Sequence, residues 1–360
     1  MKILSLSLDD SILDPQSPQA KRVIEYGRLI EKYTLIVLSD KEMAVDLSER
    51  VRVYGIKKKG KFFDFFSIFR SAEKFSARQI LDVISVQDHY YLALIALIIS
   101  KKFNLGLELQ VHGFEKFYGL RKLIAKYVLP RASAVRAVSQ RLKAELVTDF
   151  KVKEDKITVV PIYSEIRREA DIAGQSKKEN DKFIFLTVGR LVSIKNIALQ
   201  IAAMTKILEK EGTAELWVVG DGPEKQNLEK LSRNMRIGDS IKFWGWQEDM
   251  EKFYARADVF LFTSDYEGWG LAVIEAAGYG LPIIMTDVGC AREIIRENES
   301  GIIIPINDRK NLEQAMSNLL ENKELRYRLG FGARLALEKL PSKEETLNLY
   351  KASWEKAAKK

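Results

Sequence analysis

Two glutamates, Glu267 and Glu275, stand eight positions apart on either side of a glycine-rich turn. The apolar run Val259–Phe262 before them is typical of a buried parallel strand, and the residues after Gly270 indicate a short helix. Gly268 and Gly270 let the backbone turn sharply and approach a ligand closely. A helix that begins after such a strand binds phosphate well, whereas carboxylates suit sugar hydroxyl groups. The segment therefore predicts a site for a nucleotide sugar.

The stretch from Glu267 to Glu275 resembles the glutamate–seven–glutamate motif of the retaining GT-B glycosyltransferases of family 4. The spacing alone would equally suit a solvated loop and a solvated helix, but Ser264-Asp265 and Gly280-Leu281-Pro282 favour the family. The resemblance implies that Glu267 contacts the donor hexose and acts in catalysis, and that Glu275 holds the ribose hydroxyls. We expect the N–H groups at Gly270-Leu271 to face the donor diphosphate.

Two cations, Arg190 and Lys195, flank a turn after another apolar run, residues 183–188. Cations at the carboxyl end of a parallel strand suit a pyrophosphate, and an arginine binds its oxygens through two parallel hydrogen bonds. Two ordinary surface cations are the alternative. The stretch resembles the glycine–arginine–five–lysine element of the same family, in which these side chains grip the donor diphosphate. Since two cations and a helix end suffice for the leaving group, we expect no metal and no cofactor besides a UDP- or GDP-linked donor.

Gly220 and Asp221 follow the apolar run 215–219 and precede a helix start. The segment resembles the part of the family that lines the nucleotide-base pocket, although a plain turn after a core strand explains these residues equally well. His112 and Gly113 follow the strand-like run 107–111, at the kind of strand end where open α/β sheets bind ligands.

A hydrogen-bonded structural histidine is the alternative for His112. Its resemblance to the histidine–glycine element of the family's acceptor domain implies a catalytic contact with the donor sugar from the opposite domain. The second histidine, His89, is expected to begin a helix and to be partly solvated.

Apolar runs alternate with amphipathic helical stretches in both halves of the chain, which indicates an α/β protein with parallel, doubly wound sheets. By resemblance this is the GT-B fold, with two Rossmann-like domains that face a cleft. We expect an acceptor-binding domain at 1–165, a nucleotide-sugar-binding domain at 166–340, and a helix at 341–360 that returns to the first domain. The polar stretch Pro161–Lys182 is the expected link. Asp9–Asp14 stands where the family often has paired glycines.

The positive charge lies in the first half of the chain. Residues 1–165 hold 28 lysines and arginines against 20 acidic residues, and residues 166–360 hold 30 of each. A basic half favours an acidic partner, and an anionic membrane surface is expected to meet a segment of lysines and phenylalanines. A solvated loop followed by the buried face of a helix is the alternative for this segment, and no nucleic-acid motif surrounds it. The segment comprises Lys57, Lys58, Lys59, Lys61, Phe62 and Phe63.

A single cysteine excludes an internal disulfide and favours the cytoplasm. The basic first half adds the expectation of a peripheral location at the inner face of the membrane. The expected function is the metal-independent transfer of a hexose, with retention, from a nucleotide sugar to a glycan or lipid-linked glycan, as in polysaccharide biosynthesis. One alternative is a non-catalytic sugar-nucleotide-binding or scaffold protein on the same fold. Another is a GT-B epimerase or phosphorylase, although Lys195 suits a diphosphate better than a pyridoxal phosphate.

Overall fold

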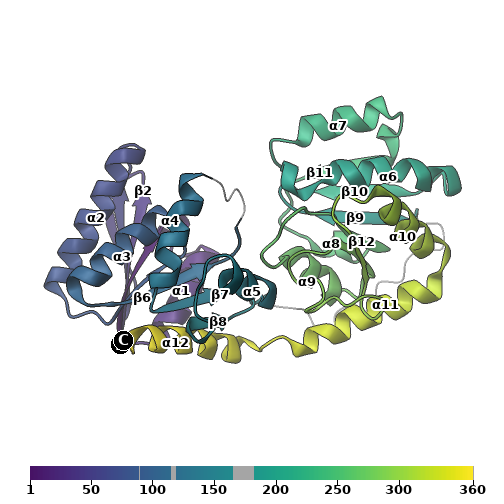
Figure 1. Ribbon diagram of the computed structural model, residues 1–360. Coiled ribbons are helices and arrows are strands. Elements are labelled where there is room, and N and C mark those ends of the chain that lie inside the picture. Colours follow the sequence, from purple (N-terminus) through teal and green to yellow (C-terminus); the bar gives the residue numbers. More distant parts are fainter. Residues whose placement is uncertain (89, 115–118, 165–181, 360) are drawn as a thin grey trace. The chain divides into compact units, whose positions relative to one another are not determined.

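The computed structural model describes residues 1–88, 90–114, 119–164 and 182–359 of the 360-residue chain. It divides into two compact units, Met1–Pro161 with Pro341–Lys360, and Ile162–Leu340. Each unit is a largely parallel sheet with helices on both faces (Figure 1), so the predicted α/β class with two doubly wound sheets is confirmed. The boundary expected between residues 165 and 166 lies outside the described residues.

The sheet of the first unit has eight strands in the order β3-β4-β2-β1-β5-β6-β7-β8. All neighbours are parallel except β3 and β4, which pair antiparallel at one edge. The sequence did not predict β3, an edge strand whose side chains are exposed or only partly buried and give no core signal. The strands are β1 (Lys2–Ser7), β2 (Lys32–Ser39), β3 (Met43–Ser48), β4 (Val51–Lys57), β5 (Val83–Val86), β6 (Gly106–Val111), β7 (Ala134–Ala137) and β8 (Ile157–Val159).

Helices cover both faces of this sheet. On one face α3 lies between α2 and α4 and packs against both. On the other face α1 and the last helix, α12, share a hydrophobic cluster with alternate residues of β1 and β2, such as Ile3 and Leu35. The helices of this unit are α1 (Pro18–Arg28), α2 (Lys61–Arg78), α3 (Tyr91–Phe103), α4 (Leu120–Val128), α5 (Gln140–Thr148) and α12 (Lys343–Ala358).

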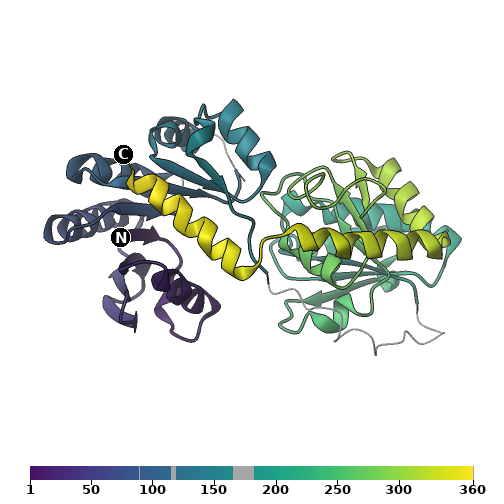
Figure 2. The same ribbon diagram turned by 90° about the horizontal axis from the view of Figure 1, so that it is seen from below.

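The helix α12 is part of the core of the first unit, as expected of a returning C-terminal helix (Figure 2). Its Trp354 is fully buried. Beside it, the Ser353 hydroxyl donates to Glu108 Oε1 at 3.0 Å, and Arg136 Nε lies 3.3 Å from the same oxygen. The Arg136 guanidinium sits 3.7 Å from the centroid of the Tyr350 ring. Polar pairing and aromatic packing thus hold α12 on the sheet.

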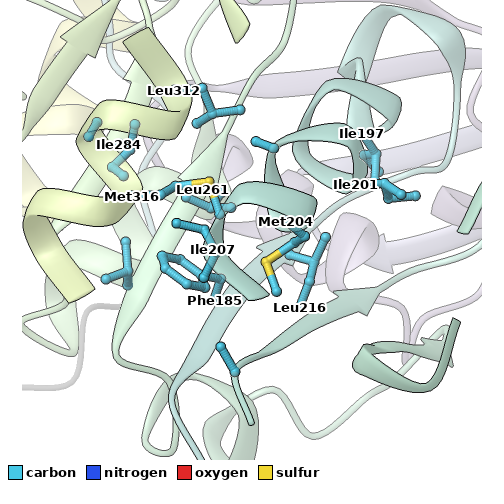
Figure 3. Close-up of a cluster of buried hydrophobic side chains, with 14 of the residues drawn as sticks. Phe185, Ile197, Ile201, Met204, Ile207, Leu216, Leu261, Ile284, Leu312 and Met316 are labelled. Carbon is cyan, nitrogen blue, oxygen red and sulfur yellow. The ribbon is translucent and has the colours of Figure 1, made fainter. Parts of the chain in front are cut away.

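The second unit has six parallel strands in the order β11-β10-β9-β12-β13-β14. Its core packs strand residues such as Phe185 and Leu261 against Met204 of α6 and Met316 of α10 (Figure 3). The strands are β9 (Ile184–Val188), β10 (Glu215–Val219), β11 (Ile241–Gly245), β12 (Val259–Phe262), β13 (Ile283–Thr286) and β14 (Ile302–Ile304). The helices are α6 (Ile197–Lys210), α7 (Lys225–Asn234), α8 (Glu251–Tyr254), α9 (Leu271–Gly278), α10 (Arg309–Glu321) and α11 (Lys323–Ala336).

The strand order of the second unit reverses between β9 and β12. Successive strands run outward from β9 to β11 on one side, and from β12 to β14 on the other. Such a switch point leaves a crevice at the carboxyl ends of the two central strands, where open α/β sheets bind ligands.

Among the described residues, no helix is both long enough and apolar enough to cross a membrane.

Candidate functional site

The switch point of the second unit brings together two loops that the sequence analysis singled out. One loop follows β9 and contains Lys195, and the other follows β12 and contains Glu267. The backbone N–H of Asp265 donates to the carbonyl of Ile194 at 2.8 Å, so the two loops are tied to each other directly. Residues from distant parts of the sequence therefore share one crevice.

Lys195 and Glu267 form an ion pair in this crevice. The lysine side chain is 21% exposed and the glutamate side chain 10% exposed, so water screens the pair only in part. Ser264 Oγ donates to the same carboxylate oxygen at 3.2 Å, and the Lys195 ammonium lies 5.5 Å from the centroid of the Phe262 ring. The sequence predicts a ligand contact for each of these charged residues, but not their contact with each other.

Buried polar side chains fix the backbone that carries Lys195. Gln200 Nε2 donates to Thr263 Oγ1 at 2.8 Å and to Thr187 Oγ1 at 3.2 Å. Thr263 Oγ1 in turn lies 3.2 Å from the carbonyl oxygen of Lys195 and 3.1 Å from that of Asn196. The sequence analysis missed this network. One residue in the sequence indicates such a network: a glutamine on the otherwise apolar inner face of α6. A buried glutamine needs hydrogen-bond partners, because buried polar groups in proteins are hydrogen-bonded.

The glycine turn before α9 has the geometry that the sequence predicts. Gly270 has a φ of 104° and precedes the first helical residue, Leu271, which is 37% exposed. The loop after β13 supports this turn, since the Cys290 N–H donates to the Trp269 carbonyl at 2.8 Å. Gly289 has a φ of 57°, and a Cβ atom there would come within 2.3 Å of the same carbonyl oxygen. Gly289 and Cys290 are further residues that the sequence analysis missed.

Glu275 lies half-buried on α9 and accepts a hydrogen bond from the Tyr254 hydroxyl at 2.7 Å. Tyr254 is 2% exposed and stacks on Tyr279, with 5.2 Å between ring centroids. Burial, and then the negative charge of Glu275, raise the pKa of Tyr254 well above its ordinary value, so the phenol remains a donor. The Tyr254 hydroxyl donates to Oε2 of Glu275 and so holds the Glu275 side chain in one orientation.

Gly220 and Asp221 belong to a tight backbone contact between the ends of β9 and β10. A Cβ atom on Gly220, whose φ is 131°, would lie 2.0 Å from the Gly189 carbonyl oxygen. The Asp221 carbonyl accepts from the Leu191 N–H at 2.8 Å, and its carboxylate accepts from the Gly222 N–H at 2.7 Å. The close approach of Gly220 and the bonds of Asp221 fix the conformation of this turn.

The other two predicted residues of this unit lie in the loops after β9 and β12. Arg190 is exposed and follows Gly189 at the end of β9. Gly268 is buried in the turn between Glu267 and Trp269. Among the described residues, no three or more histidine, cysteine, aspartate or glutamate side chains are grouped so that they could hold a metal ion.

The first unit has a separate cavity, of about 410 Å³, at the carboxyl ends of β1, β5 and β6. His112 lines it from the end of β6. Dense protein around the imidazole, together with the positive charges of Arg136 and Arg22, lowers the pKa of His112 to about 4, although the residue as a whole remains exposed. The imidazole is therefore neutral near pH 7. The cavity is lined by Ser7, Leu8, Asp9, Gln87, Asp88, Tyr90, Leu92, His112 and Gly113.

The loop Asp9–Asp14 also borders this cavity, through Asp9. Asp9 caps a short 3-10 helix, and its carboxylate accepts from the Ser11 N–H at 3.1 Å. The next residue, Asp10, accepts from Lys58 Nζ at 2.8 Å, which lowers the pKa of Asp10. Asp10 therefore partly neutralises the positive charge of Lys58, one of the lysines expected to meet an anionic membrane surface. The helix start expected at His89 lies outside the described residues.

Two family models match the chain, one on each half. The model "Glycosyltransferase Family 4" matches residues 29–162, and the model "Glycosyl transferases group 1" matches residues 168–335. The lipopolysaccharide core biosynthesis glycosyltransferase LpsE of Rhizobium meliloti is 30% identical over 149 residues, which are 41% of this chain and 43% of the relative. The N-acetyl-alpha-D-glucosaminyl L-malate synthase of Bacillus anthracis is 29% identical over 253 residues, 67% of this chain and 65% of the relative. The chain thus matches less than two thirds of the length of either relative.

Solved structures resemble the chain over nearly its whole length. Sucrose-phosphate synthase from Thermosynechococcus elongatus has a TM-score of 0.79 at 20% identity and covers 97% of this chain and 96% of its own. Anabaena Alr3699/HepE in complex with UDP-glucose has a TM-score of 0.74 at 17% identity and covers 99% and 98%. At these identities the likeness concerns the fold, and it confirms the GT-B fold class.

Proposed function

We propose that this protein, a glycosyltransferase of the family 4, GT-B type, transfers a hexose from a nucleoside diphosphate sugar to a glycan or a lipid-linked glycan. Retention at the anomeric carbon, independence of a metal ion, and a cytoplasmic location are parts of the same proposal. One observation carries it: the Lys195–Glu267 pair lies beside the glycine turn that begins α9, at the switch point of the sheet. Cation, carboxylate and free N–H groups together suit a sugar diphosphate.

In the proposed reaction, the bond between the anomeric carbon and the diphosphate oxygen breaks. The acceptor hydroxyl oxygen bonds to that carbon, and its proton passes to the departing diphosphate. Lys195, Arg190 and the N–H groups at Gly270-Leu271 stabilise the negative charge that develops on the leaving group. Glu267 binds hydroxyls of the hexose. Its pairing with a lysine and a serine favours this binding role over covalent attack on the sugar.

Glu275 is proposed to hold the ribose hydroxyls through the carboxylate oxygen that Tyr254 leaves available, and neutral His112 to contact the donor sugar from the first unit. The solved relatives support the ligand classes. The Anabaena protein was solved in complexes with UDP, glucose and UDP-glucose, and another neighbour, TarM, with UDP and the glycan Fondaparinux. These ligands support a nucleotide-sugar donor, of which a UDP-linked hexose is the first to test, and a glycan acceptor.

A thermal-shift titration with UDP, GDP and their hexose conjugates, with and without EDTA, tests the donor site. A ligand that binds only the folded state raises the melting temperature by mass action, by RT ln(1 + [L]/Kd) in free energy. We expect a shift with one nucleoside diphosphate that persists in EDTA and is lost in Lys195→Ala. Lys230→Ala, at an exposed position on α7 of the same unit, is the matched control and should keep the shift.

The same preparations are then assayed for hexose transfer to a lipid-linked glycan. A shift that is equal in Lys195→Ala and Lys230→Ala would refute the assignment of the site. A shift without transfer to any glycan would favour the scaffold alternative, and release of free sugar or sugar phosphate without an acceptor would favour an epimerase or a phosphorylase.

A further inference from the structure

The helix α4 of the first unit exposes large apolar side chains among cations. Leu120 is 61% exposed, Leu123 65% and Tyr127 47%. Residues three and four apart share a helix face, so these three form one stripe. No acidic residue occurs in the helix, and its exposed cations are Arg121, Lys122 and Lys126. A surface helix of an ordinary globular protein carries mainly polar residues on its outer side, so this composition calls for a partner.

The neighbouring helices extend this surface. α3 packs against both α2 and α4, so the three helices form one layer (Figure 1). On α2, Phe63 is 62% exposed and Phe66 47% exposed, so these two phenylalanines lie on the outer side of the helix, whereas Ile68 is buried. The exposed side chains of α2, α3 and α4 are called the basic helical face below.

Most of the excess charge of the first half belongs to these three helices. They contain nine lysines and arginines and two acidic residues, a net charge of +7, whereas residues 1–165 together have a net charge of +8. One of the two acidic residues, Glu73, is paired with Lys102. The basic helical face overlaps the segment of lysines and phenylalanines expected from the sequence only where α2 begins, at Phe63. In that segment Asp10 engages Lys58, and the side chains of Lys61 and Phe62 lie outside the described residues.

Cations alone would suit nucleic acid, an acidic protein or anionic lipid. Exposed leucines between the cations favour lipid over nucleic acid, because they gain nothing from a phosphate backbone but partition into the boundary between headgroups and acyl chains. An interfacial helix combines leucine and aromatic residues with lysine and arginine in this way. The composition of α4 thus fits a lipid surface better than a polyanion.

The N-terminal end of α4 adjoins the cavity of the first unit. Arg121 lies 5.4 Å from the centroid of the Tyr90 ring, and Tyr90 lines the cavity that contains His112. We infer that the basic helical face docks on an anionic bilayer and brings this cavity to the headgroup layer, where a lipid-linked acceptor would present its sugar. The assignment of the acceptor rests on the proposed function, whereas docking on the bilayer does not.

Vesicle co-sedimentation of the full chain tests the docking, with phosphatidylcholine alone and with about 30 mol% phosphatidylglycerol added. We expect binding only to the anionic vesicles, and weaker binding as salt rises to about 0.5 M. In Leu120→Ser/Leu123→Ser the partition coefficient should fall by about tenfold or more, because each leucine loses its apolar contact with lipid. Phe331→Ser/Leu335→Ser on α11 is the control, since these residues are 59% and 49% exposed in the second unit.

The charges are tested in the same way. Lys122→Gln/Lys126→Gln should weaken binding to anionic vesicles by about fivefold for each lysine, whereas Lys230→Gln/Lys310→Gln in the second unit should change it little.

Insertion into the bilayer can be measured with a dye attached to an introduced cysteine, because the only native cysteine, Cys290, is fully buried. An environment-sensitive dye on Leu123→Cys should shift its emission to the blue on anionic vesicles, and the same dye on Tyr327→Cys should not.

Equal vesicle binding by the wild type and Leu120→Ser/Leu123→Ser would overturn the proposal. So would binding to RNA or heparin in the absence of any vesicle binding, which would identify the partner as a polyanion. Thermal shifts with nucleoside diphosphates are recorded for every variant. Variants that keep the donor shift but lose vesicle binding separate the docking surface from the donor site, and a protein that docks without binding any donor would refute the proposed function alone.

Discussion

The pair formed by Lys195 and Glu267 should show strong energetic coupling in a double-mutant cycle. The perturbations are Lys195→Met, Glu267→Gln and their combination, compared by urea unfolding. With side chains 21% and 10% exposed, either single change leaves a charge with poor access to water. Two charges about 4 Å apart attract by about 4 kcal/mol at an effective dielectric constant of about 20. The cost of desolvating both reduces the net coupling, and we expect about 1–3 kcal/mol.

The assay can follow the second unit selectively, because four of the five tryptophans, at positions 217, 244, 246 and 269, belong to it. The control is the same cycle on Lys206 and Glu209, whose side chains are 53% and 64% exposed. Since solvent screens such a pair, its coupling should be much smaller.

Equal coupling in the two cycles would refute the reasoning, because it would mean that the partial burial of the Lys195–Glu267 pair has no energetic effect. A second consequence separates stability from binding. The double variant should recover part of the stability that each single variant loses, while it still fails to give a thermal shift with nucleoside diphosphates.

Three further predictions concern single residues. Tyr254→Phe removes a hydrogen bond to the Glu275 carboxylate, and such a bond is worth about 1.5–3 kcal/mol. If Glu275 holds the donor, this variant should bind the donor about tenfold more weakly in titration calorimetry. Unchanged affinity would exclude the orienting role of Tyr254. Gly289→Ala should destabilise the second unit by about 1–3 kcal/mol in urea unfolding, since its φ of 57° and the Trp269 carbonyl both oppose a Cβ atom; a neutral effect would contradict the packing. His112 should titrate near pH 4 by NMR, and titration near pH 6.5 would refute this assignment. Because the folded state disfavours the protonated imidazole, the contribution of His112 to stability is complete above about pH 6.5. This contribution is lost as the pH falls towards 4.

The sequence predicted the fold class, because strong signals carry it, and it singled out residues in the loops after β9 and β12. Apolar runs mark the central strands, and glycines mark the turns after β9, β10 and β12. The resemblance to family 4 added a role to each residue. It did not predict which residues contact each other: Lys195 and Glu267 are 72 positions apart, and only the order of the strands brings them together.

Partners within the core were the least predictable. Tyr254 is indistinguishable from any buried aromatic residue until the position of Glu275 is known. The network of Gln200 with Thr263 and Thr187 likewise depends on the packing of α6 against two strands. On the surface, hydropathy could not decide which phenylalanines of α2 face the solvent, because four of them occur within five residues, 62–66.

The position of α12 has a consequence for the order in which the protein can fold during synthesis. The ribosome completes residues 162–340, which form the entire second unit, before α12 is made. The first unit is translated earlier, but Trp354 and Ala357 belong to its hydrophobic core, and Gly106 has no side chain because the backbone of Ala357 occupies that space. The first unit therefore cannot complete its core until its last helix has been synthesised. The second unit, although it is translated later, can complete its core before the first unit does.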